Sequence, residues 1–202
     1  MTTPNRALVI VDVQREYFDD RPLRIEYPPR DKSLANIVEA AGIAGRTGIP
    51  VVIVQHEAPA GSPIFAAGST GWQLLDEVAF GEPVVKNYSS VFEGTGLADR
   101  LRGLGVDTVT LVGYMTNNCV LASAASAEPL GFAVEVLNDA TGAINLSNEQ
   151  GSFTAQQVHE LLMTLLHSNL AAVASTADWA AAVSSSEALP GSNLIVSAGS
   201  GL

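Results

Sequence analysis

The sequence contains little of what several common classes of protein require. A single cysteine, Cys119, occurs in 202 residues, so the chain cannot form a disulfide with itself. Ten lysines and arginines stand against 21 aspartates and glutamates, and the formal net charge of −11 opposes binding to nucleic acid or to anionic membranes. The sequence therefore predicts neither a nucleic acid nor a membrane as a partner.

Long apolar runs are also missing. In the first stretch, MTTPNRALVIVDV, Asp12 ends the apolar run too early for a secretion signal. No other stretch reaches the roughly 18 uninterrupted apolar residues that a membrane helix needs. With the lone cysteine, these absences favour a cytoplasmic protein. The chain is nonetheless 47% hydrophobic, which is enough for an ordered core. This high fraction favours a homo-oligomer with buried subunit contacts, although the many alanines can produce the same fraction without any interface.

Apolar runs alternate with amphipathic segments along residues 1–183, which we interpret as one domain. We expect strands at 7–11, 51–55, 83–86, 107–112, 133–137 and 169–175, and helices at 33–46, 97–103, 118–130 and 156–168. The alternation predicts an α/β fold, a three-layer α-β-α domain with a doubly wound six-stranded parallel sheet in the order 3-2-1-4-5-6. A turn is expected at 138–140. Residues 184–202 are mostly small and polar and are expected to form a loosely attached tail.

Three polar residues are expected at one edge of this sheet. Asp12 follows the first strand, Lys86 ends the third, and Cys119 follows the fourth at a strand-to-helix turn. Ligands of doubly wound sheets bind at the carboxyl ends of the strands, where the strand order reverses. A helix N-terminus and a nearby lysine would lower the pKa of Cys119. Each residue also has a plain structural interpretation, as a turn aspartate, a surface lysine and a buried cysteine.

The sequences around these residues resemble the isochorismatase-like cysteine hydrolases, a family that includes nicotinamidases, N-carbamoylsarcosine amidases and streptothricin hydrolase. The matching stretches are ALVIVDVQREYF around Asp12, VVKNYSSVFEGTGL around Lys86, VGYMTNNCVLASAASA around Cys119, and GFAVEVLNDA after it. The likeness spans residues 6–183. It implies that the chain hydrolyses an amide-like carbon–nitrogen bond of a small molecule through a thioester acyl-enzyme.

The resemblance also implies a catalytic triad. Asp12 would take the thiol proton, Lys86 would hold the pair electrostatically, and the thiolate of Cys119 would attack a carbonyl carbon. Members of the family carry a cis peptide bond at the position of Tyr114-Met115. The backbone amides of Met115 and Cys119 would form the oxyanion hole.

The resemblance is incomplete where some relatives bind a metal. Zinc-containing nicotinamidases have an Asp-x-His pair and a further histidine after the second strand, whereas this chain has QHEAPAGSPIF, in which His56 is the only histidine. One histidine beside Glu57 does not supply the three or four ligands that a divalent metal requires. We therefore expect no metal and no other cofactor, and nicotinamide is disfavoured as the substrate. His159 and His167 are expected to be core or solvated residues of a helix.

Four residues on the loops after the first three strands are candidates for the substrate pocket: Gln14, Phe18, Trp72 and Tyr88. The resemblance places Phe18 at the pocket-lining aromatic of the family. The segment 69–72 is a candidate for a lid over the site. Its Trp72 would equally suit a position in a subunit interface.

Two alternatives to an amide hydrolase stay open. True isochorismatases cleave a vinyl ether without needing a thiol, so the presence of Cys119 favours the amide-cleaving branch. A catalytically silent binding member would keep the fold and lack turnover. A nucleotide-binding α/β protein is not expected, because the segment VDVQREYF after the first strand contains no glycine.

Overall fold

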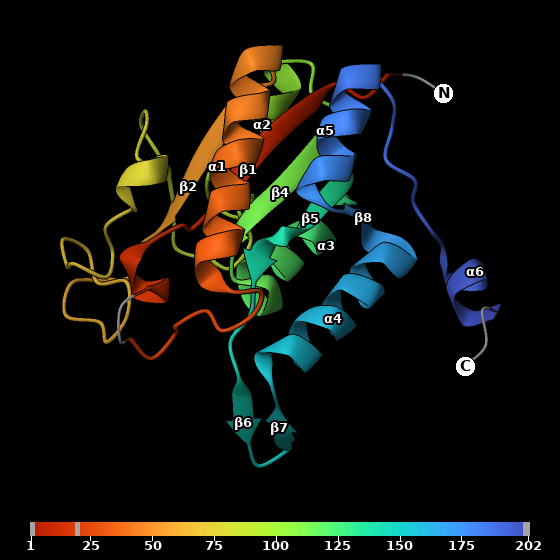
Figure 1. Cartoon of the computed structure of the whole chain (residues 1–202). Coiled ribbons are helices and arrows are strands. Elements are labelled where there is room, and N and C mark those ends of the chain that lie inside the picture. The colour runs from red at the N-terminus through yellow and green to blue at the C-terminus, as the bar shows by residue number, and fades with distance from the viewer. Residues whose placement is uncertain (1–2, 19–20, 200–202) are drawn as a thin grey trace.

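The structure is a computed structural model that describes residues 3–18 and 21–199. Its centre is a parallel sheet in the order β3-β2-β1-β4-β5-β8 (Figure 1). The six strands are β1 (Arg6–Val11), β2 (Val51–His56), β3 (Val84–Lys86), β4 (Thr108–Tyr114), β5 (Ala133–Gly142) and β8 (Ala172–Ala174). Counted within the sheet, this is the predicted order 3-2-1-4-5-6, which is confirmed.

Helices cover both faces of the sheet. They are α1 (Arg30–Thr47), α2 (Leu97–Gly103), α3 (Leu121–Ala127), α4 (Ala155–Leu165), α5 (Thr176–Ser185) and α6 (Leu194–Gly199). Val9 of β1 belongs to a core cluster with Leu101 of α2 and Ala124 of α3, whereas Leu8 belongs to a second cluster with Ile37 of α1 and Trp179 of α5. Because neighbouring strand residues face opposite sides, these clusters confirm the three-layer architecture.

No helix in the described part of the chain has both the length and the apolar character needed to cross a membrane.

Four short helical turns complete the fold: η1 (Arg15–Tyr17), η2 (Asp76–Val78), η3 (Thr116–Val120) and η4 (Leu166–Leu170). The helix expected at 118–130 therefore begins as the π-helical turn η3, which carries Cys119, and it ends at Ala127.

Other elements differ from the expectations. The prediction of a turn at 138–140 is wrong, because β5 continues to Gly142. A register shift between Leu111 and Gly113 of β4 keeps β4 and β5 paired. The hairpin of β6 (Leu146–Asn148) and β7 (Gly151–Phe153) was not predicted, and neither was α5. Short exposed strands and an alanine-rich helix carry no clear hydrophobic period.

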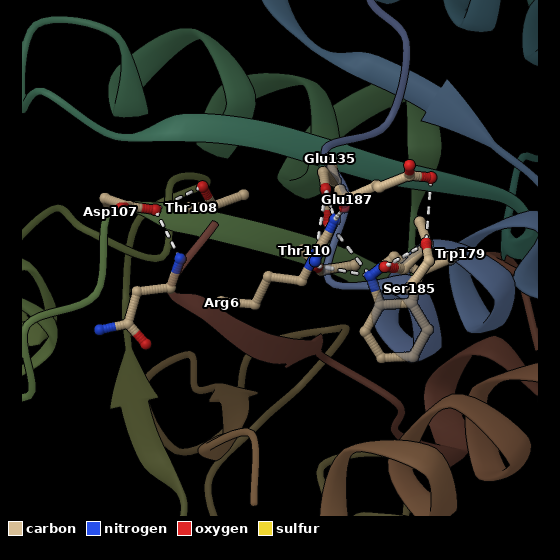
Figure 2. Close-up of polar contacts among 10 residues, drawn as sticks. Arg6, Asp107, Thr108, Thr110, Glu135, Trp179, Ser185 and Glu187 are labelled. Atoms are coloured by element: carbon tan, nitrogen blue, oxygen red, sulfur yellow. Dashed lines mark hydrogen bonds and ion pairs between the residues drawn. The ribbon is translucent and has the colours of Figure 1, made fainter. Parts of the chain in front are cut away.

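A buried polar cluster holds α5 against the amino-terminal end of the sheet (Figure 2). Arg6 forms an ion pair with Glu135 at 2.8 Å, and the indole N–H of Trp179 donates to the same carboxylate at 3.0 Å. Arg6 also donates to the backbone carbonyl of Glu187 at 2.6 Å, which ties the chain after α5 to the domain. Burying these charges is tolerable only because they are paired.

Beyond this point, Leu189 is buried, but α6 buries none of its side chains and lies at the periphery (Figure 1). The helix α6 was not predicted. The division into a domain at 1–183 and a loosely attached tail at 184–202 stays a prediction, and residues 200–202 lie outside the described residues.

Gly113 provides a test of the close contact between β4 and β1. Its φ is +105°, and a Cβ at this position would clash with the backbone of Val11. We predict that Gly113→Ala lowers the free energy of unfolding by about 3 kcal/mol or more, measured by chemical denaturation. Gly103→Ala is the matched control, because nothing surrounds its Cβ position. It should be neutral or stabilise by up to about 1 kcal/mol. Equal stabilities of the two variants would contradict the prediction.

Candidate active site

The three polar residues expected at one edge of the sheet lie together there. Asp12 follows β1, Lys86 ends β3, and Cys119 lies in η3 directly after β4. Their exposed fractions are 0%, 1% and 3%. Lys86 reaches past the end of β2 to meet the other two, because β2 lies between β3 and β1 in the sheet.

The ammonium group of Lys86 is the centre of the site. Its Nζ lies 2.7 Å from Oδ2 of Asp12, and it donates hydrogen bonds to Sγ of Cys119 at 3.3 Å and to the backbone carbonyl of Tyr88 at 3.0 Å. It also lies 3.2 Å from Nδ1 of His56. One buried cation therefore contacts a carboxylate, a thiol, an imidazole and a carbonyl group.

Asp12 is a buried carboxylate. Its Oδ2 forms a close ion pair with Lys86 at 2.7 Å, and the side chains of Lys86 and Cys119 and the backbone of His56 interact with the carboxylate as hydrogen-bond partners. Burial raises the pKa of Asp12 above its usual value, and the ammonium of Lys86 and the thiol of Cys119 oppose only part of this shift. A carboxylate with a raised pKa that lies beside a thiol is well suited to accept a proton.

The pKa of Cys119 is raised, so the expectation that it is lowered is wrong. Burial, and after it the negative charge of Asp12, raises the pKa of the thiol to about 12, and Lys86 offsets only part of this rise. The sequence indicated the helix N-terminus and the lysine but showed neither the depth of burial nor the adjoining carboxylate. The raised pKa favours the protonated thiol at neutral pH.

The turn that carries Cys119 is closed by Met115. The Tyr114-Met115 peptide bond is cis, as the resemblance implied. The carbonyl of Met115 accepts hydrogen bonds from the amides of Asn118 at 3.1 Å and Val120 at 3.2 Å. The use of the Met115 and Cys119 amides as an oxyanion hole stays a prediction.

His159 braces the same turn from α4. Its Nε2 lies 2.9 Å from the carbonyl oxygen of Asn138, which can only accept, so Nε2 carries the proton and Nδ1 accepts from the hydroxyl of Thr116 at 3.1 Å. Burial lowers the pKa of His159, which favours this neutral form. The expected core position is confirmed by an exposed fraction of 3%, but no local pattern indicated a partner 43 residues away.

Gln14 ties together the loops around the site. Its Oε1 accepts from the amide of His56 at 2.9 Å, and its Nε2 donates to the carbonyls of His56 at 2.8 Å and Trp72 at 2.7 Å. These bonds hold the half-buried Trp72 near the ends of β1 and β2. Gln14 thus has a structural use within the chain, and the proposed roles of Gln14 and Trp72 toward a substrate stay predictions.

Phe18 and Tyr88 lie in contrasting surroundings. Phe18 is buried and packs edge-on against Tyr114, with ring centroids 5.7 Å apart, while the guanidinium of Arg30 lies 5.2 Å from its ring centroid. Tyr88 is 61% exposed. Their roles as pocket walls also stay predictions.

Tyr17 was missed by the sequence analysis. It is buried and packs against Phe65 at a centroid distance of 5.3 Å. Burial, followed by electrostatic interactions with Cys119 and Asp12, raises the pKa of Tyr17 well above its usual value. The sequence analysis selected its neighbour Phe18, because the sequence does not show how either of two adjacent aromatic side chains is oriented.

A metal centre has little support among residues 3–18 and 21–199. No group of three or more histidine, cysteine, aspartate or glutamate side chains there is arranged to hold a metal ion. Nδ1 of His56 faces Lys86, and a cation beside it opposes a second one. The expectation of no metal stays a prediction.

Comparisons with known proteins show the family of the chain. A sequence profile of the isochorismatase domain matches residues 6–178. The chain belongs to the isochorismatase family of hydrolases. A solved structure of a proposed isochorismatase from Burkholderia xenovorans LB400 resembles this one with a TM-score of 0.94 and 45% identity, covering 98% of this chain and 96% of that chain. The resemblance inferred from the three motifs is thereby confirmed.

Other members of the isochorismatase family differ in their described roles. The secreted isochorismatase effector Isc1 of Verticillium dahliae is 33% identical over 144 residues, which are 70% of this chain and 74% of that protein. The structure of N-carbamoylsarcosine amidase from Thermoplasma acidophilum has a TM-score of 0.67 and 26% identity, covering 87% of this chain and 97% of that chain. The family therefore includes amidases as well as a secreted protein.

His56 should make the protein less stable in mild acid. Burial, and then the positive charge of Lys86, lowers the pKa of His56 to about 4, while the carbonyl of Tyr88 opposes the shift weakly. A histidine in the unfolded chain has a pKa of about 6.5, so the unfolded chain binds the proton more tightly than the folded protein does. The stability that the neutral His56 contributes is therefore complete above a pH of about 6.5 and is lost as the pH falls toward 4.

We predict that the wild type loses more free energy of unfolding between neutral pH and pH 4 than His56→Asn does. Urea denaturation at several pH values measures the difference, and subtraction of the two curves removes the contribution of the carboxylates. Parallel curves would show that His56 is not held in its neutral form.

Proposed function

We propose that the protein is a cysteine hydrolase that cleaves an amide-like carbon–nitrogen bond of a small molecule through a thioester acyl-enzyme. The observation that carries this proposal is the contact of one buried ammonium, Lys86, with both the Asp12 carboxylate at 2.7 Å and the Cys119 sulfur at 3.3 Å. Burying three ionisable groups together costs stability, and such clusters gather at sites where proton transfer is needed.

In the first half of the proposed reaction, the sulfur of Cys119 attacks the carbonyl carbon while Asp12 takes the thiol proton. A carbon–sulfur bond forms and the carbon–nitrogen bond breaks. The proton passes from Asp12 to the leaving nitrogen, which departs as ammonia or an amine. Lys86 stabilises the charge on the sulfur, and the amides of Met115 and Cys119 would stabilise the oxyanion.

In the second half, water attacks the thioester while Asp12 takes one of its protons. The new carbon–oxygen bond forms, the carbon–sulfur bond breaks, and the proton returns to the sulfur. The raised pKa of Asp12 supports both transfers, because it makes the carboxylate a stronger base than an exposed one. No cofactor is required for either half.

The relatives support two chemistries. The likeness to an N-carbamoylsarcosine amidase supports cleavage of a carbon–nitrogen bond, whereas the likeness to a proposed isochorismatase supports the alternative of ether hydrolysis. Ether hydrolysis would use Asp12 without the thiol. The hydrogen bond from Lys86 to Cys119 favours the first chemistry, since an ether hydrolase has no use for it. A silent binding member of the fold is the remaining alternative.

We predict that Cys119→Ala abolishes amide hydrolysis, with a loss of at least about 10³-fold in kcat, because the nucleophile is gone. The measurement is an ammonia-release screen over cyclic amides, carbamoyl compounds and simple carboxamides. Asp12→Asn should be equally inactive, because it removes the base that serves both halves of the reaction.

The pattern across these variants separates the alternatives. Amide hydrolysis that survives Cys119→Ala would refute the proposal. Turnover of a vinyl ether that survives Cys119→Ala but not Asp12→Asn would establish the ether hydrolase instead. Absence of any turnover, together with a Cys119 that resists alkylation, would favour the silent binding member.

We further propose that the protein acts in the cytoplasm. The lone cysteine, which cannot form a disulfide within the chain, supports this setting. The related effector Isc1 is secreted, so cell fractionation of the source organism is the decisive measurement. Recovery of the protein mainly from the medium would contradict the proposal.

We also propose a homo-oligomer. Large apolar side chains are exposed on α4 and α6, among them Leu161, Leu165, Leu194 and Ile195. Contact with a second copy would remove this apolar surface from water. Light scattering in solution should give a multiple of the 21.0 kDa chain mass, and a single chain mass at all concentrations would contradict this.

A further inference from the structure

Lys86 has three ammonium hydrogens and four close acceptors. Three acceptors meet the donating directions of the ammonium: the Tyr88 carbonyl at 3.0 Å, Nδ1 of His56 at 3.2 Å and Sγ of Cys119 at 3.3 Å. Asp12 is nearest, with Oδ2 2.7 Å from Nζ in an ion pair. Four acceptors therefore share three hydrogens, and the direction of each N–H bond depends on which acceptors hold the ammonium.

The protonation of His56 follows from this arrangement. An ammonium group only donates, so Nδ1 of His56 must present its lone pair, and the ring proton lies on Nε2. The acceptor is also held in place. The ring packs edge-on against Phe65 with centroids 5.1 Å apart, and the backbone amide and carbonyl of His56 are both bound by Gln14.

We infer that His56 is a positioning residue for the nucleophile, an inference that rests on the proposed function. His56 and the Tyr88 carbonyl fix two N–H bonds of Lys86. Because the ammonium is tetrahedral, fixing two of its N–H bonds directs the third at the sulfur of Cys119.

Without an acceptor at position 56, only the Tyr88 carbonyl and the weaker bond to the sulfur would hold the ammonium against rotation about its Cε–Nζ bond. Its nearest negative charge is Asp12, at 2.7 Å, so an N–H would align with that carboxylate at the expense of the sulfur. The sulfur would then lose the donor that stabilises its thiolate. His56 therefore decides how the single cation is shared between the base and the nucleophile.

The test uses the rate at which iodoacetamide alkylates Cys119, which needs no substrate and reports on the only cysteine of the chain. His56→Leu removes the acceptor, and His56→Asn places an amide oxygen where Nδ1 was. We expect alkylation to be about tenfold slower in His56→Leu and within about threefold of wild type in His56→Asn, the scale of a hydrogen bond to a charged group.

His167→Asn is the control for loss of a histidine elsewhere. His167 lies in η4, and its Nδ1 accepts a hydrogen bond from the amide of Val173 at 3.1 Å. Its alkylation rate should equal that of the wild type. Equal rates in His56→Leu and wild type, or a His56→Asn variant as slow as His56→Leu, would overturn the inference.

With a substrate in hand, kcat of His56→Leu should fall about tenfold while KM changes by less than about twofold. A change in KM alone would assign His56 to substrate binding and overturn the positioning role. Failure of the proposed function is a separate result, because wild-type protein would then show no turnover whatever the alkylation rates.

If His56→Leu does not fold, the wild type still decides the question. The ¹⁵N chemical shifts of the imidazole at neutral pH should show an unprotonated Nδ1 and a protonated Nε2. A protonated Nδ1 could not accept from Lys86 and would overturn the inference.

Discussion

One buried ammonium group organises the candidate site at the edge of the sheet. Lys86 is 1% exposed, and its charge balances a carboxylate while its hydrogens reach a sulfur, an imidazole and a carbonyl. Without this cation, the carboxylate of Asp12 would stand in the core without a counter-charge. The geometry of the site therefore follows from where the sheet places one long side chain, at the end of β3, two strands away from β1.

The sheet itself could be predicted because its strands are buried on both faces. Continuous apolar runs such as residues 7–11 are typical of such strands, and their alternation with amphipathic segments gave the strand order. The elements that were missed lack this pattern. The hairpin β6–β7 is exposed, α5 is rich in alanine, and β5 runs on through Asn138 and Asp139, whose composition is typical of a turn.

The candidate site could be predicted only in part. Asp12, Lys86 and Cys119 were identified because each closes or follows a strand, and parallel strands bring such positions to one edge. Their electrostatics could not be predicted, since the pKa of Cys119 depends on burial and on the distance to Asp12. The roles of His56, Tyr17 and His159 likewise depend on contacts between segments far apart in sequence, and no local pattern reports those.

The carboxylate of Asp12 and the sulfur of Cys119 both contact the ammonium of Lys86. The most direct test is to titrate the Cys119 thiol in wild-type protein and in Asp12→Asn, following thiolate absorbance in the ultraviolet. Because the negative charge of Asp12 raises the pKa of Cys119, its removal should lower that pKa from about 12. An identical pKa in both proteins would show that the two side chains do not share a site.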